Sequence, residues 1–431
     1  MKKKITALIL AAAIAIMAAG CGTSGESTST SVESTAESSS VTTDTSEETS
    51  SSDTTTSFVT KDSITVSETY SSTADGEHAI DADGTDAEYS NISVTKTGDS
   101  SSEDADFYGD NAAIIAQNGA TLTISEAVIE TDGSHANAVF SYGEGTTVNI
   151  SDSYIETTGN NSGGLMTTGG GTTIATNLTV VTYGNSSAAI RSDRGGGTVN
   201  VTGGSYSTYG VGSPVIYSTA DITVTGATLT SDGSEGVVVE GSNSVELIDC
   251  TVTANNTELN SDNSDLYKAV MIYQSMSGDA AEGEATFTMN GGTFTNLNGD
   301  MFFVTNTTAT INLTNVTFTG ADGNFLTISA AGWGNSGSNG GDVTLNASDQ
   351  VIEGDMYIDS ISSLILNLSD GSSFTGAINT DGQEGDVTVT LDGGSVWTLT
   401  GDSYITSLDV VDGTIDLNGY TLYVNGVEYT A

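Results

Sequence analysis

From about residue 79 onward, the chain is built from units that repeat at an irregular period of 23 to 33 residues. This repeat constrains the fold more than any other feature, because one short unit cannot bury an apolar face by itself. Each unit contains three short strand-like runs, separated by turn signals such as N-G and D-G. The units begin near Ala79, Ala112, Asn137, Gly163, Ala188, Pro214, Val237, Ala269, Met301 and Phe325. The pattern indicates a solenoid whose units stack on one another.

Apolar residues recur at equivalent positions of the three runs. The first run has an expected inward column of Ile114, Val139, Leu165, Ile190, Ile216, Val239, Met271, Phe303 and Leu326. In the second run, pairs such as Leu122/Ile124 are expected to point inward, and Ile174/Thr176 is the weakest of these pairs. The third run has the column Ile129, Ile155, Val180, Tyr206, Leu229, Val252, Phe294 and Phe318. Alternation within each run means that every second side chain stacks on its equivalent in the next unit.

Three parallel strands per unit, stacked about 4.8 Å apart, define an all-β, single-stranded parallel β-helix of about ten or more coils. We expect the right-handed form, because crossovers between parallel strands are right-handed in most folds. A seven-bladed propeller is the competing interpretation. It needs blades of about 40–45 residues, and these units are too short.

The chain divides by composition into four expected segments: a signal peptide (1–20), a disordered linker (21–57), the β-helix (58–341), and C-terminal coils with a cap (342–431). In the last segment the runs become shorter and more often punctuated by Asp and Gly. We expect these final coils to close the solenoid, because an open coil end would template aggregation.

The first 20 residues have three lysines, a short apolar stretch and the small residues A-A-G before Cys21. This arrangement is typical of an export signal, since the apolar stretch is too short to span a bilayer. Its end resembles a bacterial lipoprotein signal, which implies that Cys21 carries the lipid of the mature protein. Ala18 departs from that pattern, which usually has Leu there. The alternative is a plain secretory signal in which Cys21 is incidental.

The linker is rich in Ser, Thr, Glu and Asp and contains almost nothing to bury, so we expect it to stay disordered. It would hold the folded part away from a membrane. With Cys21 acylated, Cys250 has no partner and is expected to be a small core residue.

The whole chain carries 8 Lys and Arg against 56 Asp and Glu, a formal net charge of −48. Such a field repels phosphates and excludes binding to nucleic acid or to anionic lipid headgroups. Cations, neutral glycans and basic partners remain as possible ligands.

The stacked columns and the leader resemble the pectin-lyase-like right-handed β-helix superfamily, and more narrowly the adhesin-like, carbohydrate-binding surface lipoproteins of anaerobic bacteria. The likeness covers about residues 60 to 430. It implies a lipid-anchored protein on the extracellular face of a cell membrane, expected as a monomer, with a polysaccharide or cell-surface glycan as partner. Related β-helix enzymes carry their substrate cleft on one outer sheet.

The outward neighbours of the first inward column predict such a surface. They are Ile115, Phe140, Met166, Arg191, Tyr217, Glu240, Ile272 and Val304, and they lie beside a column of small residues. Large beside small residues along a stack predicts a shallow apolar trough. The alternative is that a long connection, 255–268 or 100–111, folds over this stripe and buries it.

The predicted ligand-binding residues are Phe140, Tyr142, Met166, Arg191, Asp193, Arg194, Tyr217 and Glu240, together with Tyr183 and Tyr209. The last two occupy equivalent positions in adjacent coils, where their rings could receive a sugar face or brace each other. Arg191 and Arg194 suit a carboxylate ligand or a salt bridge to Asp193 or Glu240. The resemblance to polysaccharide lyases implies Arg191 as the base if the protein is an enzyme.

Three further motifs each have a functional and a structural interpretation. Asp81, Asp83 and Asp86 supply hard oxygens suited to calcium, although solvated turns explain them equally well. N-T-D-G at 379–382 matches one short polygalacturonase motif without the rest of that signature, which favours a turn. Outward threonine pairs in four units, 228/230, 251/253, 293/295 and 317/319, are similar to ice-binding ladders, although threonine also simply favours exposed strands.

These observations predict a non-catalytic surface β-helix that binds a glycan or another extracellular ligand. Bases are scarce, and no assembled acid, base or nucleophile is visible in the sequence. The alternatives are a calcium-dependent polysaccharide lyase acting on acidic polysaccharide and, third, an ice-binding β-helix.

Overall fold

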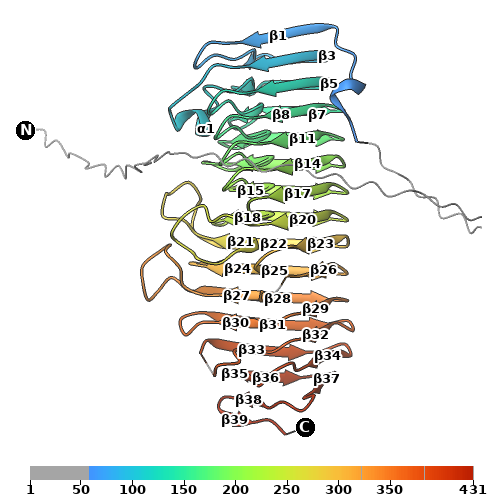
Figure 1. Ribbon diagram of the computed structural model, residues 1–431, viewed down its shortest axis with the longest axis vertical. Coiled ribbons are helices and arrows are strands. Elements are labelled where there is room, and N and C mark those ends of the chain that lie inside the picture. Colours follow the sequence, from blue (N-terminus) through green and yellow to red (C-terminus); the bar gives the residue numbers. More distant parts are fainter. Residues whose placement is uncertain (1–57, 322, 383, 431) are drawn as a thin grey trace, which may run out of the picture. The chain divides into compact units, whose positions relative to one another are not determined.

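The chain folds as the predicted parallel β-helix, seen in a computed structural model that describes residues 58–321, 323–382 and 384–430 (Figure 1). All of these residues belong to one compact unit, Thr56–Ala431. The expected signal peptide, Cys21 and the linker lie outside the described residues.

The first runs of successive coils form an 11-stranded sheet, here called the first-run sheet, in which every pair of neighbours is parallel. Its strands are β2 (Ile80–Asp83), β4 (Ile114–Gln117), β6 (Val139–Tyr142), β9 (Leu165–Thr168), β12 (Ile190–Ser192), β15 (Ile216–Ser218), β18 (Val237–Glu240), β21 (Lys268–Tyr273), β24 (Asp300–Thr305), β27 (Leu326–Ile328) and β30 (Met356–Ile358).

The second and third runs share a 21-stranded sheet, because β3 (Ala87–Lys96) and β5 (Thr121–Thr131) pass through both. The second-run strands are β7 (Thr147–Ser151), β10 (Gly171–Thr176), β13 (Gly197–Thr202), β16 (Asp221–Thr225), β19 (Ser244–Ile248), β22 (Glu284–Asn290), β25 (Thr307–Thr314), β28 (Gly341–Ser348), β31 (Ser363–Ser369), β33 (Asp386–Leu391) and β36 (Ser407–Val410). The third-run strands are β1 (Glu68–Ser72), β8 (Tyr154–Thr157), β11 (Thr179–Thr182), β14 (Ser205–Thr208), β17 (Thr228–Asp232), β20 (Thr251–Asn255), β23 (Thr293–Asn296) and β26 (Thr317–Thr319).

The C-terminal coils continue this stack in two smaller sheets. A 4-stranded sheet holds β29 (Val351–Glu353), β32 (Ser373–Thr375), β34 (Ser395–Thr398) and β37 (Gly413–Asp416), and a 3-stranded sheet holds β35 (Ser403–Ile405), β38 (Leu422–Val424) and β39 (Val427–Glu428). The stack runs through residue 341, since β28 pairs with both β25 and β31. At the end, β39 folds back antiparallel on β38.

Two short helices, a 3-10 turn η1 (Lys61–Ser63) and the helix α1 (Asp104–Tyr108), lie outside the coils. Figure 1 shows α1 and the longest loops projecting on the same side of the stack. These projections lie on the side of the first-run sheet, and they build the site described below.

Between the second and third runs, the chain turns at a residue in the left-handed conformation, and in three coils a glycine with positive φ follows it. This residue is Asn91, Glu126, Asp152, Asn177, Gly203, Gly226, Asp249, Gly291, Asn315, Asp349 or Asp370 in successive coils. Asn, Asp and Gly tolerate positive φ best, which explains why they dominate this column.

The turn from the third run back to the first run contains a stacked column of glycines. A Cβ on Gly184 would lie 1.8 Å from the carbonyl oxygen of Gly159, and one on Gly210 would lie 1.9 Å from that of Gly184. Beside this column, the Ser187 backbone N–H donates to Ser213 Oγ (2.9 Å), and Ser162 N–H donates to Ser187 Oγ (2.9 Å). These contacts lock adjacent coils in register.

The first-run register differs from the predicted one after Ile216. Val270 and Phe302 stack inward, whereas Met271 and Phe303, which were predicted to be inward, point outward. Ile272 and Val304, expected outward, therefore lie in the main core. The prediction failed because β21 and β24 are buried on both faces, so apolar residues no longer alternate along them.

The second run was also misassigned in one coil. Thr173 and Ala175 take the inward positions beside Val199 and Val201, while Ile174 is 42% exposed. The inward Thr173 is satisfied because its hydroxyl pairs with that of Thr167 (2.7 Å). The third-run column was predicted correctly from Ile129 to Phe318.

Candidate functional site

The outward stripe of the first-run sheet is apolar along most of its length, although Val238, Met271 and Phe303 take the places predicted for Glu240, Ile272 and Val304. In chain order it comprises Ile115, Phe140, Met166, Arg191, Tyr217, Val238, Met271 and Phe303. Two groups of these residues form clusters separate from the main core. Long connections cover both clusters, so the trough is not open along its length.

The first cluster lies beneath the N-terminal cover, defined here as residues 98–111 and including α1. Phe140 and Met166, both predicted as ligand-binding residues, are fully buried there. Gly109 packs against them so closely that a Cβ would lie 2.9 Å from the Phe140 ring. Tyr142 is half-buried with its ring 5.7 Å from that of Tyr108, centroid to centroid. Phe140 and Met166 are therefore packing residues.

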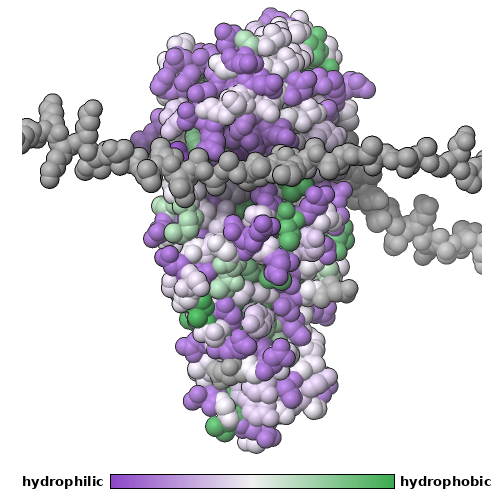
Figure 2. Space-filling model, turned by 60° about the vertical axis from the view of Figure 1, so that its left-hand side comes forward, coloured by the Kyte–Doolittle hydropathy of each residue, from purple (hydrophilic) through white to green (hydrophobic). Residues whose placement is uncertain are grey.

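The second cluster lies beneath the C-terminal cover, defined here as residues 256–267 together with residues 330–339. Leu266, Ala331 and Trp333 pack on the cluster that contains Met271. The two loops are joined where the Gly332 backbone N–H donates to the carbonyl of Asn263 (2.6 Å). On the face shown in Figure 2, hydrophobic residues accordingly lie in small separate groups among hydrophilic ones.

Between the two covers, the stripe opens into a groove with a volume of about 540 Å³. Its floor is formed by Arg191 of β12 and Tyr217 of β15. Phe107 of the N-terminal cover lines one end, Asn260 of the C-terminal cover lines the other, and Asp279 lies on the segment between β21 and β22. Segments far apart in sequence therefore meet in this groove.

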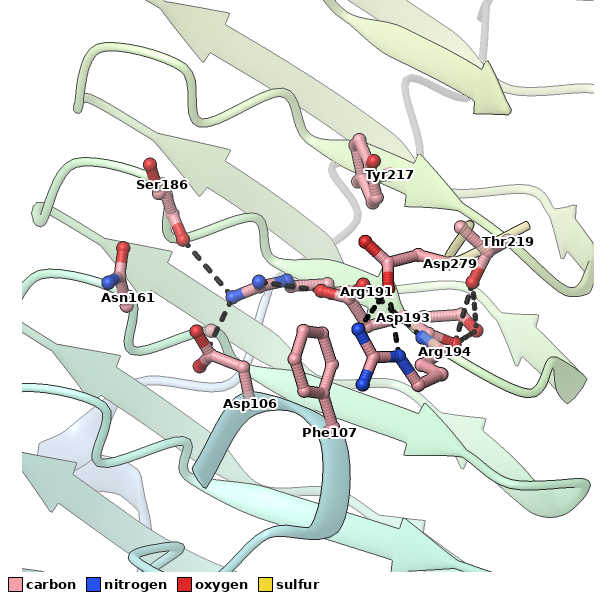
Figure 3. Close-up of polar contacts among 12 residues, drawn as sticks. Asp106, Phe107, Asn161, Ser186, Arg191, Asp193, Arg194, Tyr217, Thr219 and Asp279 are labelled. Atoms are coloured by element: carbon pink, nitrogen blue, oxygen red, sulfur yellow. Dashed lines mark hydrogen bonds and ion pairs between the residues drawn. The ribbon is translucent and has the colours of Figure 1, made fainter. Parts of the chain in front are cut away.

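Arg191 is held in place by two carboxylates (Figure 3). Its guanidinium lies 2.8 Å from Asp193 Oδ2 and 3.6 Å from Asp106 Oδ1, and only 12% of its side chain is exposed. Burial lowers the pKa of Arg191, but Asp106 and Asp193 outweigh this effect and raise the pKa above its usual value. Burial raises the pKa of Asp193, and the ion pair with Arg191 opposes that shift.

Asp106 fastens the N-terminal cover to the coils. Its Oδ2 lies 3.1 Å from His135 Nδ1, and its Oδ1 faces Arg191. His135 Nε2 lies 3.0 Å from the side-chain amide of Asn161, an arrangement that fits a proton on Nδ1 shared with Asp106.

Arg194 bridges two segments at the mouth of the groove. Its Nε and Nη2 both donate to Asp279 Oδ1, at 2.8 and 2.6 Å. Its guanidinium carbon also lies 3.8 Å from the centroid of the Phe107 ring (Figure 3). With 44% of its side chain exposed, Arg194 is the more accessible arginine of the pair predicted from the sequence.

Glu240 is buried beneath two tyrosines rather than exposed in the groove. Its Oε2 accepts hydrogen bonds from the hydroxyls of Tyr217 and Tyr273, the second at 2.9 Å. Burial raises the pKa of both tyrosines well above the usual value, and the Glu240 charge adds to this shift. Tyr217 is half-buried and lines the groove, so it remains a candidate contact, whereas Glu240 positions it.

Tyr183 and Tyr209 stack on the outside of the molecule, as their equivalent positions predicted. Their ring centroids lie 5.2 Å apart with an interplanar angle of 14°, and they are 49% and 47% exposed. They are not among the residues that line the groove. They form a separate candidate surface on the neighbouring turn.

Asp81, Asp83 and Asp86 do not gather into a metal site. Each one instead accepts a hydrogen bond from the next coil, from Gln117 Nε2 (3.0 Å), Asn118 Nδ2 (2.5 Å) and Thr121 N–H (2.8 Å) respectively. No group of three or more His, Cys, Asp or Glu side chains suited to a metal ion occurs in the part of the chain that the structure describes. These aspartates therefore serve the turns, the alternative that the sequence left open.

The remaining sequence motifs lie in a turn, in the strands and in the core of the β-helix. Asn379 of N-T-D-G starts a turn with positive φ, and its side chain accepts the Ile358 N–H (2.8 Å). The threonine pairs stack into a four-coil outward ladder on β17, β20, β23 and β26. Cys250 is a free, fully buried core residue.

Sequence reasoning missed several residues of the groove region, namely Asp106, Phe107, Tyr273, Asp279 and Trp333. All except Tyr273 lie on connections outside the strands, where no periodicity predicts position. The scarcity of bases was a usable signal: Arg191, Arg194 and Lys268 each pair with a carboxylate, although the buried Lys96 bonds the Ala74 carbonyl instead.

Comparisons with known proteins add one structural likeness. No family model matches the chain, and no curated protein matches its sequence. Among solved structures, the gp42 tailspike of the Acinetobacter phage vb_AbaP_AS12 is similar at 14% identity and a TM-score of 0.26. The match covers 84% of this chain and 58% of the tailspike, so this chain spans little more than half of that protein. Within the described ranges, no helix has the length and apolar character needed to cross a bilayer.

Proposed function

We propose that this protein is a cell-surface lipoprotein whose β-helix binds an extracellular glycan without transforming it, in an adhesin-like role. One observation carries the proposal: an open groove on a rigid stack in which aromatic rings lie beside polar groups that already have partners. Aromatic faces suit the apolar faces of sugar rings, and ordered polar groups suit their hydroxyls. The anchor would be a lipid on Cys21, and the site would face the cell exterior.

The charges of the groove favour a neutral glycan over an acidic one. Four carboxylates line it, those of Glu103, Asp106, Asp193 and Asp279, against the two guanidinium groups of Arg191 and Arg194. Both arginines are already paired with carboxylates. A uronate entering the groove would therefore meet an excess of negative charge.

The geometry of Arg191 argues against the lyase alternative. A base must first lose its own proton, and the two carboxylates beside Arg191 favour the protonated guanidinium.

The outward threonine ladder supports the third candidate, ice binding. Shaping of ice crystals at subzero temperature would support that candidate.

A glycan array with matched variants tests the proposed function. We expect neutral oligosaccharides to bind the wild type, and Arg194→Ala to weaken binding about tenfold or more, because it removes the bridge at the groove mouth. The control is Tyr183→Ala/Tyr209→Ala, which removes the exposed ring pair outside the groove.

Three results would contradict the proposal. Absence of glycan binding would overturn it altogether. Loss of binding in the tyrosine variant but not in Arg194→Ala would move the site to the stacked rings. Release of unsaturated product from polygalacturonate with calcium, abolished by Arg191→Ala, would establish the lyase instead.

A further inference from the structure

The third-run strands part between two adjacent coils, at β26 and β29. Strand β26 pairs with β23 of the preceding coil, and β29 pairs with β32 of the following coil. Although both strands are fully described, they do not pair with each other and belong to different sheets. The first and second runs of the same two coils stay paired, through β24 with β27 and β25 with β28. The separation is therefore confined to one edge of the stack.

This separation leaves a cleft with a volume of about 700 Å³, here called the wedge. Phe318 and Phe325 line it, with ring centroids 5.4 Å apart and an interplanar angle of 90°. Phe318 continues the inward column of the third run, yet it is only half-buried, whereas Phe294 in the coil before it is fully buried. The wedge therefore exposes an apolar floor that other coils keep inside.

The side-chain amide of Gln350 already occupies one end of the separation. Its Oε1 accepts the Val316 N–H (2.8 Å), and its Nε2 donates to the Val316 carbonyl (2.7 Å). The same Nε2 donates to the Val351 carbonyl (2.7 Å). This amide thus bonds the backbone on both sides, as a peptide group of an intervening strand would. The space between the two strands accepts a peptide group at this end.

Beyond this amide, backbone groups of both strands face the wedge. Successive residues of a parallel strand direct their N–H and C=O groups alternately to the two neighbouring strands. Thr317 N–H donates to the Gly292 carbonyl of the preceding coil (3.0 Å), so the backbone groups of Phe318 point into the wedge. Glu353 faces it from β29, because the next N–H along the chain donates to the Thr375 carbonyl of the following coil (3.0 Å). Such edges can pair with an added strand.

The charges around the wedge indicate the chemistry of that strand. The exposed residues Asp349 and Glu353 line it, and its described lining residues include no lysine or arginine. The whole chain has a formal net charge of −48. A basic segment would be attracted to the wedge, whereas the acidic segment of this chain before residue 58 would be repelled.

We propose that the wedge binds an extended, basic segment of another protein as an added strand between β26 and β29. The backbone of this segment bonds the groups of Phe318 and Glu353. Its apolar side chains lie on the phenylalanine floor, and its basic side chains lie near Asp349 and Glu353. The inference is independent of the proposed glycan binding, because the wedge and the groove share no lining residue among those described.

A synthetic peptide of alternating lysine and valine provides the probe. Strands β26 and β29 have 3 residues each and span about 10 Å, so a labelled peptide of about seven residues covers the wedge. Two matched peptides accompany it: one carries N-methyl groups on alternate amides, and one has glutamate in place of lysine. N-methylation keeps the charge but removes backbone donors, which separates strand pairing from attraction to an acidic surface. Fluorescence anisotropy with the full chain, at about 0.15 M salt, measures binding.

We expect the lysine peptide to bind, and the N-methylated and glutamate peptides to bind more than about tenfold more weakly. Glu353→Lys should weaken binding of the lysine peptide about tenfold, because it reverses a charge at the wedge. Glu428→Lys reverses an exposed charge on β39 and should stay within about twofold of the wild type. Circular dichroism of both variants checks that the coils are intact.

Hydrogen exchange locates the bound peptide on the wild-type chain. The lysine peptide should slow amide exchange within residues 317–320 and 351–354, which border the wedge. Protection confined to the groove instead would overturn the proposal.

Four other results would also overturn it. They are no binding of the lysine peptide, equal binding of its N-methylated form, equal losses in the two glutamate variants, and stronger binding of the glutamate peptide. The last result would favour the acidic segment of this chain itself as the occupant. Glycan binding by the groove is unaffected by any of these results.

Discussion

At the scale of single residues, the stack depends on positions where a side chain has no room. Gly184 lies on the turn that returns the third run to the first, and the space for its Cβ is taken by backbone atoms of Gly159. Because those atoms belong to the adjacent coil, relief requires the coils to move apart. The constraint acts between coils and not within one turn.

We predict that Gly184→Ala lowers the free energy of unfolding by about 2–3 kcal/mol, because its Cβ would overlap rigid backbone. Urea denaturation followed by circular dichroism measures the change. Gly320→Ala is the matched control, since a Cβ there has nothing within 4 Å, and it should change stability by less than about 0.5 kcal/mol. Equal effects of the two substitutions would show that coil spacing is not limited by the glycine column.

At the scale of elements, the connections supply the walls of the groove, above a floor made by strands. The N-terminal cover contributes the buried Ala105 and Asp106 and the partly buried Phe107, and it hides apolar side chains of three coils. Its own helix has only 5 residues and would not form alone in water. Docking onto the stripe therefore holds the cover in place.

We predict that Ala105→Glu releases the N-terminal cover, because a carboxylate at this fully buried position would lack a partner. Proteolysis within residues 98–111 and binding of a hydrophobic dye to the exposed stripe should both rise several-fold, whereas the strand signal in circular dichroism should be unchanged. Asp104→Ala, at an exposed position of the same helix, should behave like the wild type. If the N-terminal cover of the Ala105→Glu variant resisted protease as the wild type does, docking onto the stripe would not be what holds it in place.

How well the sequence predicts the inward face of a strand depends on what covers its outer face. Alternation in the third run, as at Ile155 and Val180, predicted the inward face correctly because the outward neighbours are only half-buried. In β24 the consecutive residues Met301 to Val304 are all buried, since a cover packs on the outer face, and the pattern no longer distinguishes the two sides. Arg191 was placed in the groove correctly, but its partner Asp106 reaches it only through the fold of a connection.

At the scale of the whole molecule, stability and charge are coupled through pH. Tyr206 is fully buried and its hydroxyl has no hydrogen-bond partner among the described residues. Burial raises its pKa, and burial beside Glu240 raises that of Tyr273. In the unfolded chain a tyrosine ionises near pH 10. Above that pH the folded protein holds more protons than the unfolded one, so its stability must fall as the pH rises.

We predict that the free energy of unfolding is steady up to about pH 10 and then falls by about 1.4 kcal/mol per pH unit for each tyrosine that stays protonated in the fold. The urea midpoint should fall with it. Tyr206→Phe removes one such group and should reduce the slope, while also removing a buried hydroxyl without a partner. The measurement is a series of denaturation curves at increasing pH. A wild-type midpoint that stays level above pH 10 would contradict the assignment.

The site is built from insertions that add no strand to the stack. Residues 98–111, 256–267 and 330–339 leave and rejoin the coils between paired strands, while β9, β12 and β15 keep their pairing beneath them. The walls of the groove are thus encoded apart from its floor, which the strands β12 and β15 supply. Exchanging the insertions between chains of this architecture offers a route to new ligands in which the part that folds is left untouched.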